Sequence, residues 1–76
     1  MSALELNDPL QRATRDGNWI YWKGVYSLGE FVTDDCYLDD GRNSVRLGSA
    51  DEGLEALLAR MPEAEAALDA MREGIR

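Results

Sequence analysis

Histidine is absent from the 76-residue sequence, and only one cysteine, Cys36, is present. Without histidine the chain has no Ser-His-Asp or Cys-His catalysis and no histidine-based metal site. One cysteine can form neither an internal disulfide nor a cysteine-rich zinc site, and a lone thiol fits a reducing cytoplasmic compartment. We therefore expect no enzymatic activity, no metal and no cofactor.

Long apolar runs and basic residues are also scarce. No run approaches the roughly 18 residues that span a membrane, and the first eight residues lack the basic flank and apolar stretch of a signal peptide. Eight Lys and Arg stand against 15 Asp and Glu, a net charge of −7. This balance argues against nucleic acid or an anionic membrane as a direct ligand and favours a basic protein partner reached by electrostatic steering.

What is present predicts one domain over residues 1–76, with a single core. Asn7-Asp8-Pro9 predicts the start of a short N-terminal helix, because a side-chain acceptor precedes proline at the first helical position. Residues 18–48 are rich in aromatic and β-branched side chains and predict antiparallel strands. Ser27-Leu28-Gly29 is expected to reverse the chain between the first two strands.

Asp40-Gly41 lies between two alternating runs, which predicts a hairpin with a two-residue type I′ loop. The apolar side chains of both strands then point to one face, which supports this register. It gives the following cross-strand pairs: Asp39 and Arg42, Cys36 and Val45, and Asp35 and Arg46.

Residues 49–76 predict helices. Ser49 and Glu52 form a capping box, and an apolar stripe follows at helical spacing. Pro62 interrupts the hydrogen-bond ladder, so we expect two helices or one strongly kinked helix. The predicted fold class is α+β, with a short N-terminal helix, a two- or three-stranded antiparallel sheet and two C-terminal helices packed on one face.

An aromatic cluster in the first strand is the first candidate site. Burial in the core is the ordinary interpretation for most of these residues. The alternative is that helices cover only one sheet face and leave aromatic rings for a partner, since Trp and Tyr are enriched at interface hot spots. Base stacking is disfavoured by the negative charge. Alternation along the strand predicts Trp19 and Tyr21 on one face and Ile20 and Trp22 on the other. The candidates are Trp19, Tyr21 and Trp22.

Acidic side chains form the second candidate set. They crowd the predicted hairpin, the first helical turn and one row of the last helix. A solvated face is the ordinary interpretation, but like charges at i, i+4 destabilise a helix, and a row of carboxylates about 6 Å apart along the axis crudely resembles a phosphate strand. A partner-binding role is the alternative. The candidates are Asp34, Asp35, Asp39, Asp40, Glu55, Glu65, Asp69 and Glu73.

Other chemistry finds little support in the sequence. The acids around Asp39-Asp40-Gly41 lack the ligand spacing of a calcium-binding EF-hand loop. The same acids disfavour a thiolate at Cys36, which we expect to be a small core residue. The glycines mark turns and do not form a phosphate-binding motif.

The layout of an aromatic-rich β region, Trp19 to Leu47, followed by an acidic helical segment, Ser49 to Arg76, resembles that of small acidic phage inhibitors of bacterial defence, the anti-CRISPR proteins. The resemblance implies binding to a basic, nucleic-acid-binding surface of a CRISPR effector and blocking it, in some cases as a DNA mimic. Two other functions stay open. One is an antitoxin or immunity protein for a basic nuclease, and the other is a housekeeping domain whose aromatic face forms a homodimer or larger oligomer.

Overall fold

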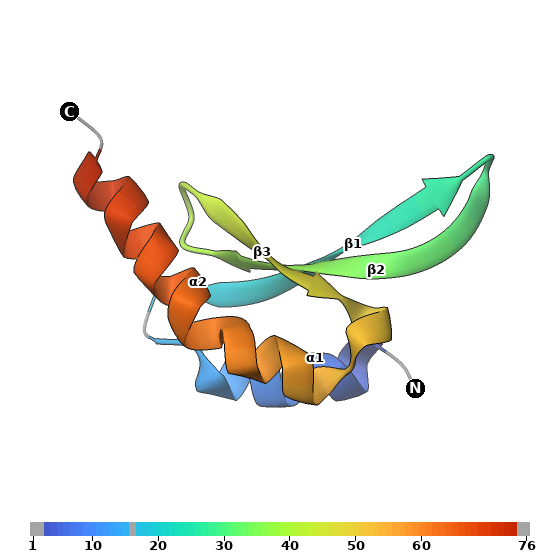
Figure 1. The fold of residues 1–76 in the computed structure, drawn as a ribbon, viewed down its shortest axis with the longest axis horizontal. Helices are drawn as coiled ribbons and strands as arrows, with labels where there is room; N and C mark the ends of the chain where they lie inside the picture. Colours follow the sequence, from blue (N-terminus) through green and yellow to red (C-terminus); the bar gives the residue numbers. More distant parts are fainter. Residues whose placement is uncertain (1–2, 16, 75–76) are drawn as a thin grey trace.

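The computed structural model describes residues 3–15 and 17–74, with side chains from residue 8 onward. The chain is an α+β protein with a three-stranded sheet and a long C-terminal helix (Figure 1). In chain order the elements are α1 (Ala3–Ala13), β1 (Trp19–Ser27), β2 (Glu30–Asp39), β3 (Ser44–Ser49), the 3₁₀ turn η1 (Ala50–Glu52) and α2 (Leu54–Gly74).

The sheet is antiparallel, with strand order β1-β2-β3. Figure 1 shows α1 and the first part of α2 on the same side of the sheet. We call this side the inner face, which carries Ile20, Cys36 and Leu38, all buried. The opposite side, the outer face, carries the residues between them in sequence, because successive strand residues alternate.

Residues 54–74 form one continuous helix, so the prediction of two separate C-terminal helices is wrong. Pro62 lies inside α2, and Figure 1 shows the helix changing direction along its length. Proline removes one main-chain donor and crowds the preceding turn, which bends a helix. Met61 and Ala64, on either side of Pro62, are both buried, and their packing holds the helix together.

The N-terminal helix begins earlier than predicted. α1 starts at Ala3, so Asn7-Asp8-Pro9 lies within the helix and is not its start. α1 packs against both β1 and α2, and Leu10 is fully buried. A short helix depends on such packing for its stability, and here the packing overrides the local start signal.

The reversal predicted at Ser27-Leu28-Gly29 is present, with Ser27 paired to Glu30. Leu28 and Gly29 have positive φ angles of 52° and 82°, as the two central residues of a type I′ turn require. The tight turn therefore lies in the first hairpin, whose Leu28-Gly29 turn contains neither Asn-Gly nor Asp-Gly.

The second hairpin has a wider loop than predicted, because pairing ends at Asp39 and Ser44. The main-chain N–H of Asp40 donates to the Asn43 carbonyl at 3.1 Å, and the Asp40 side chain accepts from the Asn43 amide at 2.8 Å. The predicted pairs are thus wrong, and a bulge follows Cys36. The observed pairs are Asp39 with Ser44, Leu38 with Val45, Tyr37 with Arg46, and Cys36 with Gly48.

The core lies between the inner face and the two helices. The predicted helical stripe supplies much of it, since Leu57, Met61, Ala64 and Leu68 are buried. Trp22, Val45, Leu54 and Leu58 pack around its margin. The buried apolar side chains are Leu10, Ile20, Cys36, Leu38, Leu47, Leu57, Met61, Ala64 and Leu68.

Candidate protein-binding face

Aromatic rings lie on the outer face of the sheet. Trp19 and Tyr21 are 43% and 36% exposed. Tyr21 lies directly opposite Tyr37 on β2, and their rings stack with centroids 5.2 Å apart and planes 11° apart. The structure thus places two of the predicted aromatic residues on a surface that none of the described helices covers, and the stacking orients Tyr21.

The Trp19 indole lies near the loop of the second hairpin. A Cβ atom at Gly41 would lie 3.5 Å from Cη2 of the indole, an ordinary van der Waals distance, and Gly41 has a φ of +93°. Glycine suits this position because it adopts the left-handed backbone without strain.

Trp22 does not belong to this surface, although the sequence made it a candidate for partner binding. Its side chain packs against the core, because Trp22 shares the inner face with Ile20. The predicted division of the first strand, with Trp19 and Tyr21 on one face and Ile20 and Trp22 on the other, is confirmed.

Charged side chains flank the aromatic rings. Arg46 Nη2 donates to Asp35 Oδ1 at 3.0 Å, so the predicted ion pair forms although the two residues are not directly opposite. Lys23 of β1 lies directly opposite Asp35 of β2, so Asp35 has a basic residue on each neighbouring strand. An aromatic centre with a charged rim has the composition of a protein-binding surface.

The two acids of the hairpin loop build the loop. Asp39 accepts from the Gly41 amide at 2.6 Å and from the Ser44 hydroxyl at 2.5 Å. The Asp40 side chain is only 2% exposed, and its Oδ2 lies 3.6 Å from Arg72 Nη1 of α2. Hydrogen bonds from the amides of Asn43 and then Arg42 lower the pKa of Asp40. Asp40 is therefore a structural residue and is not presented to a partner.

The sequence suggested that the acidic row on α2, Glu65, Asp69 and Glu73, has no basic partner. In the structure, Glu65 and Asp69 both pair with Arg15. Arg15, just after α1, lies 3.6 Å from Glu65 Oε2 and 3.0 Å from Asp69 Oδ2. Hydrogen bonds from Arg15 and then from Arg72 lower the pKa of Asp69. Glu73 is exposed in the last turn of α2. The row joins α2 to the segment before β1, which explains carboxylates at this spacing.

Several other acids make no ion pair with a base of the described part of the chain. Among residues 8–15 and 17–74, Lys23 and Arg42 are the only bases that make no ion pair with an acid, whereas a larger set of acids makes none. Of the predicted candidates, this set includes Asp34, which is half-buried on β2, and Glu55, which is exposed on α2. The acids without an ion pair in the described part of the chain are Glu30, Asp34, Asp39, Asp51, Glu55 and Glu63.

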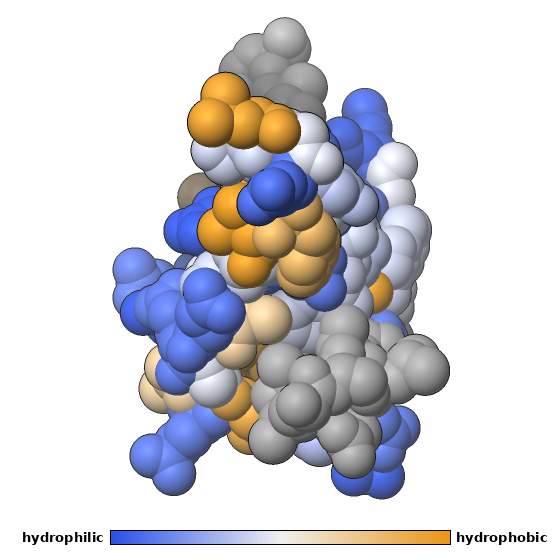
Figure 2. All heavy atoms as spheres, turned by 90° about the vertical axis from the view of Figure 1, so that its right-hand side faces the viewer, coloured by the Kyte–Doolittle hydropathy of each residue, from blue (hydrophilic) through white to orange (hydrophobic). Residues whose placement is uncertain are grey.

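The first hairpin extends beyond the helices as an arm, residues 24–33 (Figure 1). No residue of the arm is buried. Tyr26, Phe31 and Val32 are 65%, 57% and 53% exposed, and Leu28 at the tip is fully exposed. Tyr26 and Phe31 meet edge to face, with centroids 5.7 Å apart. Figure 2, viewed onto this end of the molecule, shows apolar side chains gathered at the arm and charged ones around them.

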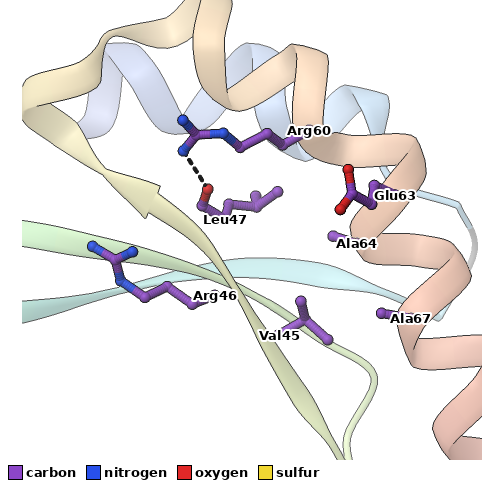
Figure 3. A pocket seen from close by; sticks show the side chains of 7 residues that line it. All are labelled: Val45, Arg46, Leu47, Arg60, Glu63, Ala64 and Ala67. Atoms are coloured by element: carbon purple, nitrogen blue, oxygen red, sulfur yellow. Dashed lines mark hydrogen bonds between the residues drawn. The ribbon is translucent and has the colours of Figure 1, made fainter.

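A shallow hollow of about 210 Å³ separates β3 from α2 (Figure 3). Val45, Leu47, Ala64 and Ala67 form its apolar wall. Figure 3 shows that the Arg46 guanidinium points away from it, on the far side of β3. The hollow is smaller than the pockets that enclose small-molecule ligands, and its size suits one apolar side chain.

Arg60 joins α2 to β3 and to the η1 turn by hydrogen bonds that the sequence did not predict; we call this set of contacts the Arg60 clip. Arg60 donates to the Leu47 carbonyl at 2.8 Å and to Glu52 Oε1 at 2.5 Å. The capping box holds the same carboxylate, since Glu52 Oε2 accepts from the Ser49 amide at 2.9 Å. Hydrogen bonds from Arg60 and then from Ser49 lower the pKa of Glu52 to about 2. Gly48 leaves the space for the Arg60 clip, because a Cβ atom there would collide with the side chains of Arg60 and Glu52.

Chemically reactive groups are few. Burial raises the pKa of the Cys36 thiol to about 12, so it is neutral at physiological pH and a poor nucleophile. Within the described residues, no three His, Cys, Asp or Glu side chains are grouped to hold a metal ion. No helix in the same part of the chain is both long and apolar enough to cross a membrane.

Comparison with known proteins adds no relative to this description. No protein family matches the chain, and neither a curated protein nor a solved structure was found to be similar to it.

Proposed function

We propose that this chain is a small protein-binding inhibitor that docks the outer face of its sheet on a basic, nucleic-acid-binding surface of a bacterial defence effector of the CRISPR type. The observation that carries the proposal is the exposure of Trp19 and Tyr21 on a sheet face without helix cover. It occurs in a chain with seven more acids than bases.

The aromatic residues would supply most of the affinity. Trp and Tyr are the commonest hot-spot residues in interfaces and bury large areas. The Tyr21–Tyr37 stack orients the Tyr21 ring before binding. A preorganised surface loses less conformational entropy on association, which favours a binding role for this face.

The acids would act mainly on the association rate. Electrostatic attraction to a basic partner accelerates encounter and weakens as salt screens it. The α2 row does not suit DNA mimicry, because Arg15 neutralises Glu65 and Asp69. Steering is better assigned to the net charge and to acids without an ion pair, such as Asp34, Asp51 and Glu55. The inhibitor would therefore cover a basic surface without reproducing a phosphate strand.

An immunity protein for a basic nuclease would use the same face and the same acids. It differs in its partner, whose gene would lie beside this one. A housekeeping oligomer would instead bury Trp19 and Tyr21 against another copy of the chain and would need no basic partner.

Competition with DNA tests the proposal. A purified CRISPR effector complex is mixed with labelled target DNA and this protein, at salt concentrations from about 50 to about 200 mM. We expect displacement of the DNA that weakens with salt. Trp19→Ala should reduce the inhibition at least tenfold, as loss of a hot spot does. Tyr26→Ala, which removes an exposed ring from the arm, is the control and should compete like the parent.

Two outcomes would refute this function. One is the absence of displacement from effectors and basic nucleases at every salt concentration. The other is equal competition by the parent and the Trp19→Ala variant. Displacement of a nuclease but of no CRISPR effector would favour the immunity-protein alternative.

A further inference from the structure

In the part of the chain that the structure describes, no strand pairs with the outer edge of β1. β1 is an outer strand in the order β1-β2-β3 and is nine residues long. The main-chain N–H of Ile20 donates to Gln11 Oε1 of α1 at 3.1 Å, so it points away from β2. Main-chain groups of an antiparallel strand alternate between its two sides. Trp22 and Gly24 therefore also direct their N–H and C=O groups away from β2.

These groups are open to another strand. Within the described residues, Gln11 caps Ile20, but no comparable hydrogen bond reaches the amides of Trp22 and Gly24. β1 has one of the usual protections of an edge strand in its middle, the single charge of Lys23. It contains no proline, and its pairing with β2 is regular up to Val25. The middle of β1 is thus a free pairing edge.

We propose that β1 pairs antiparallel with β1 of a second copy, which joins the two sheets into one of six strands. Charge supports a second copy as the occupant. β1 contains no acid, so two chains of net charge −7 can meet at its edge without opposing carboxylates. An antiparallel strand pair is also self-complementary, as a two-fold symmetric interface requires.

The residues of β1 select one register. If the two-fold axis passes Trp22, this residue faces itself and Ile20 faces Gly24 of the other copy. The Gly24 carbonyl of that copy then replaces Gln11 Oε1 as the acceptor of the Ile20 N–H. Tyr21 then lies across from Lys23 of the other copy, on the outer face and in a non-hydrogen-bonded pair, where side chains are closest. Lysine over a tyrosine ring is a favourable contact. Shifting the axis to Lys23 places two lysines directly opposite, which destabilises the pair.

The helices are compatible with this arrangement. α1 contacts β1 near Ile20 through Gln11, and Ile20 lies at one end of the paired stretch. The two-fold axis places the second α1 at the other end, on the same face of the sheet. The outer faces become continuous, and Trp19 lies outside the Tyr21–Lys23 contact between the copies. The dimer is independent of the proposed inhibition, because it is formed by the strand edge and leaves Trp19 free to bind a partner.

Sedimentation equilibrium of the full chain tests the dimer over about 10 μM to about 1 mM, a range that suits the weak association of a small interface. We expect a monomer–dimer equilibrium. Tyr21→Lys should abolish it, because it opposes Lys23 of the other copy at two symmetric positions. Adding Lys23→Glu to that variant should restore the dimer by pairing opposite charges, and circular dichroism confirms that both variants are folded.

Leu28→Lys is the matched control, because it places the same charge on the tip of the arm. It should dimerise like the parent. A second measurement is hydrogen exchange, in which the Trp22 and Gly24 amides should exchange more slowly as protein concentration rises. A parent that stays monomeric at about 1 mM overturns the proposal, as does a Tyr21→Lys variant that still dimerises or a dimer dissociated only by Leu28→Lys.

Discussion

The main-chain N–H of Arg15 donates to Glu65 Oε2 at 3.0 Å, across 50 residues of sequence. The Arg15 side chain continues along α2 and donates to both carboxylate oxygens of Asp69 at 3.0 Å. Arg72 also donates to Asp69, and it lies 3.6 Å from Asp40 of the second hairpin. These contacts join the segment before β1, the end of α2 and the β2–β3 loop, so the acids that most resemble a binding row in sequence are structural.

The first prediction follows from this relationship. Glu65→Ala removes the acceptor of the Arg15 amide and should lower the free energy of unfolding by up to about 1 kcal/mol, the usual size of one hydrogen bond. This corresponds to a fall of about 4–8 °C in Tm for a domain of this size. Glu63→Ala, on the same helix and without an ion pair in the described structure, is the control. Equal Tm values for the two variants would contradict a structural role for Glu65.

Gly48 carries the second prediction. A Cβ at this position would lie 2.6 Å from Glu52 Oε2 and 2.9 Å from Leu57 Cδ2, with φ at +155°. Gly48→Ala should therefore lower the free energy of unfolding by about 2–4 kcal/mol through strain and overpacking. Urea denaturation measures this loss. Gly74→Ala, at a position where an added Cβ meets nothing within 4 Å, should change stability little, and a comparable loss in both variants would rule out the steric explanation.

Glu52 should make stability depend on pH. Its pKa is about 2 in the folded protein, against an ordinary value of 4.5. The unfolded chain therefore takes up the proton first as pH falls. The stability that Glu52 contributes is complete above pH 4.5 and is lost progressively as the pH approaches 2. Glu52→Gln should be less stable than the parent at pH 7, and the gap should close over this interval.

Glu55→Gln provides the comparison for that titration, because Glu55 is exposed and lacks an ion pair within the described residues. At pH 7 its stability should equal that of the parent, in contrast to Glu52→Gln. Thermal melts between pH 7 and pH 2 decide the matter, and a constant gap between Glu52→Gln and the parent would show that the Arg60–Glu52 contact is not responsible.

The turn of the arm carries the fourth prediction. Leu28 has a φ of 52° and a fully exposed side chain, so it is strained without gaining burial. Leu28→Asn should raise the free energy of unfolding by about 1 kcal/mol, because Asn-Gly is the preferred type I′ sequence. Leu28→Ala keeps the unfavourable backbone and should give no gain. The expectation fails if the melting temperature does not rise in the Asn variant.

The sequence predicted the parts of the fold that depend on local pattern. Alternation placed Trp19 and Tyr21 on one face of the first strand and Ile20 and Trp22 on the other. The capping box was read correctly, since Glu52 accepts from the Ser49 amide, although it caps the turn before α2. The spacing of Leu57, Met61, Ala64 and Leu68 predicted the buried stripe.

Features that depend on distant residues were not predictable in this way. Pro62 was expected to separate two helices or to kink one strongly, and the packing of Met61 and Ala64 carries α2 across it as one helix. The loop at Asp40 widened because its carboxylate accepts from two later amides. Glu65 and Asp69 appeared unpaired because their partner, Arg15, is far away in sequence. Each of these outcomes was decided by tertiary contacts.

The binding kinetics of this protein with a purified effector test the central claim, that aromatic rings on the outer face hold a partner while acids elsewhere guide it. Trp19→Ala should raise the dissociation rate about tenfold or more and change the association rate little, as loss of a hot spot does. The Asp51→Lys, Glu55→Lys variant should slow association at low salt and leave dissociation nearly unchanged. Unchanged dissociation of the Trp19→Ala variant would contradict the assignment of the outer face as the binding surface.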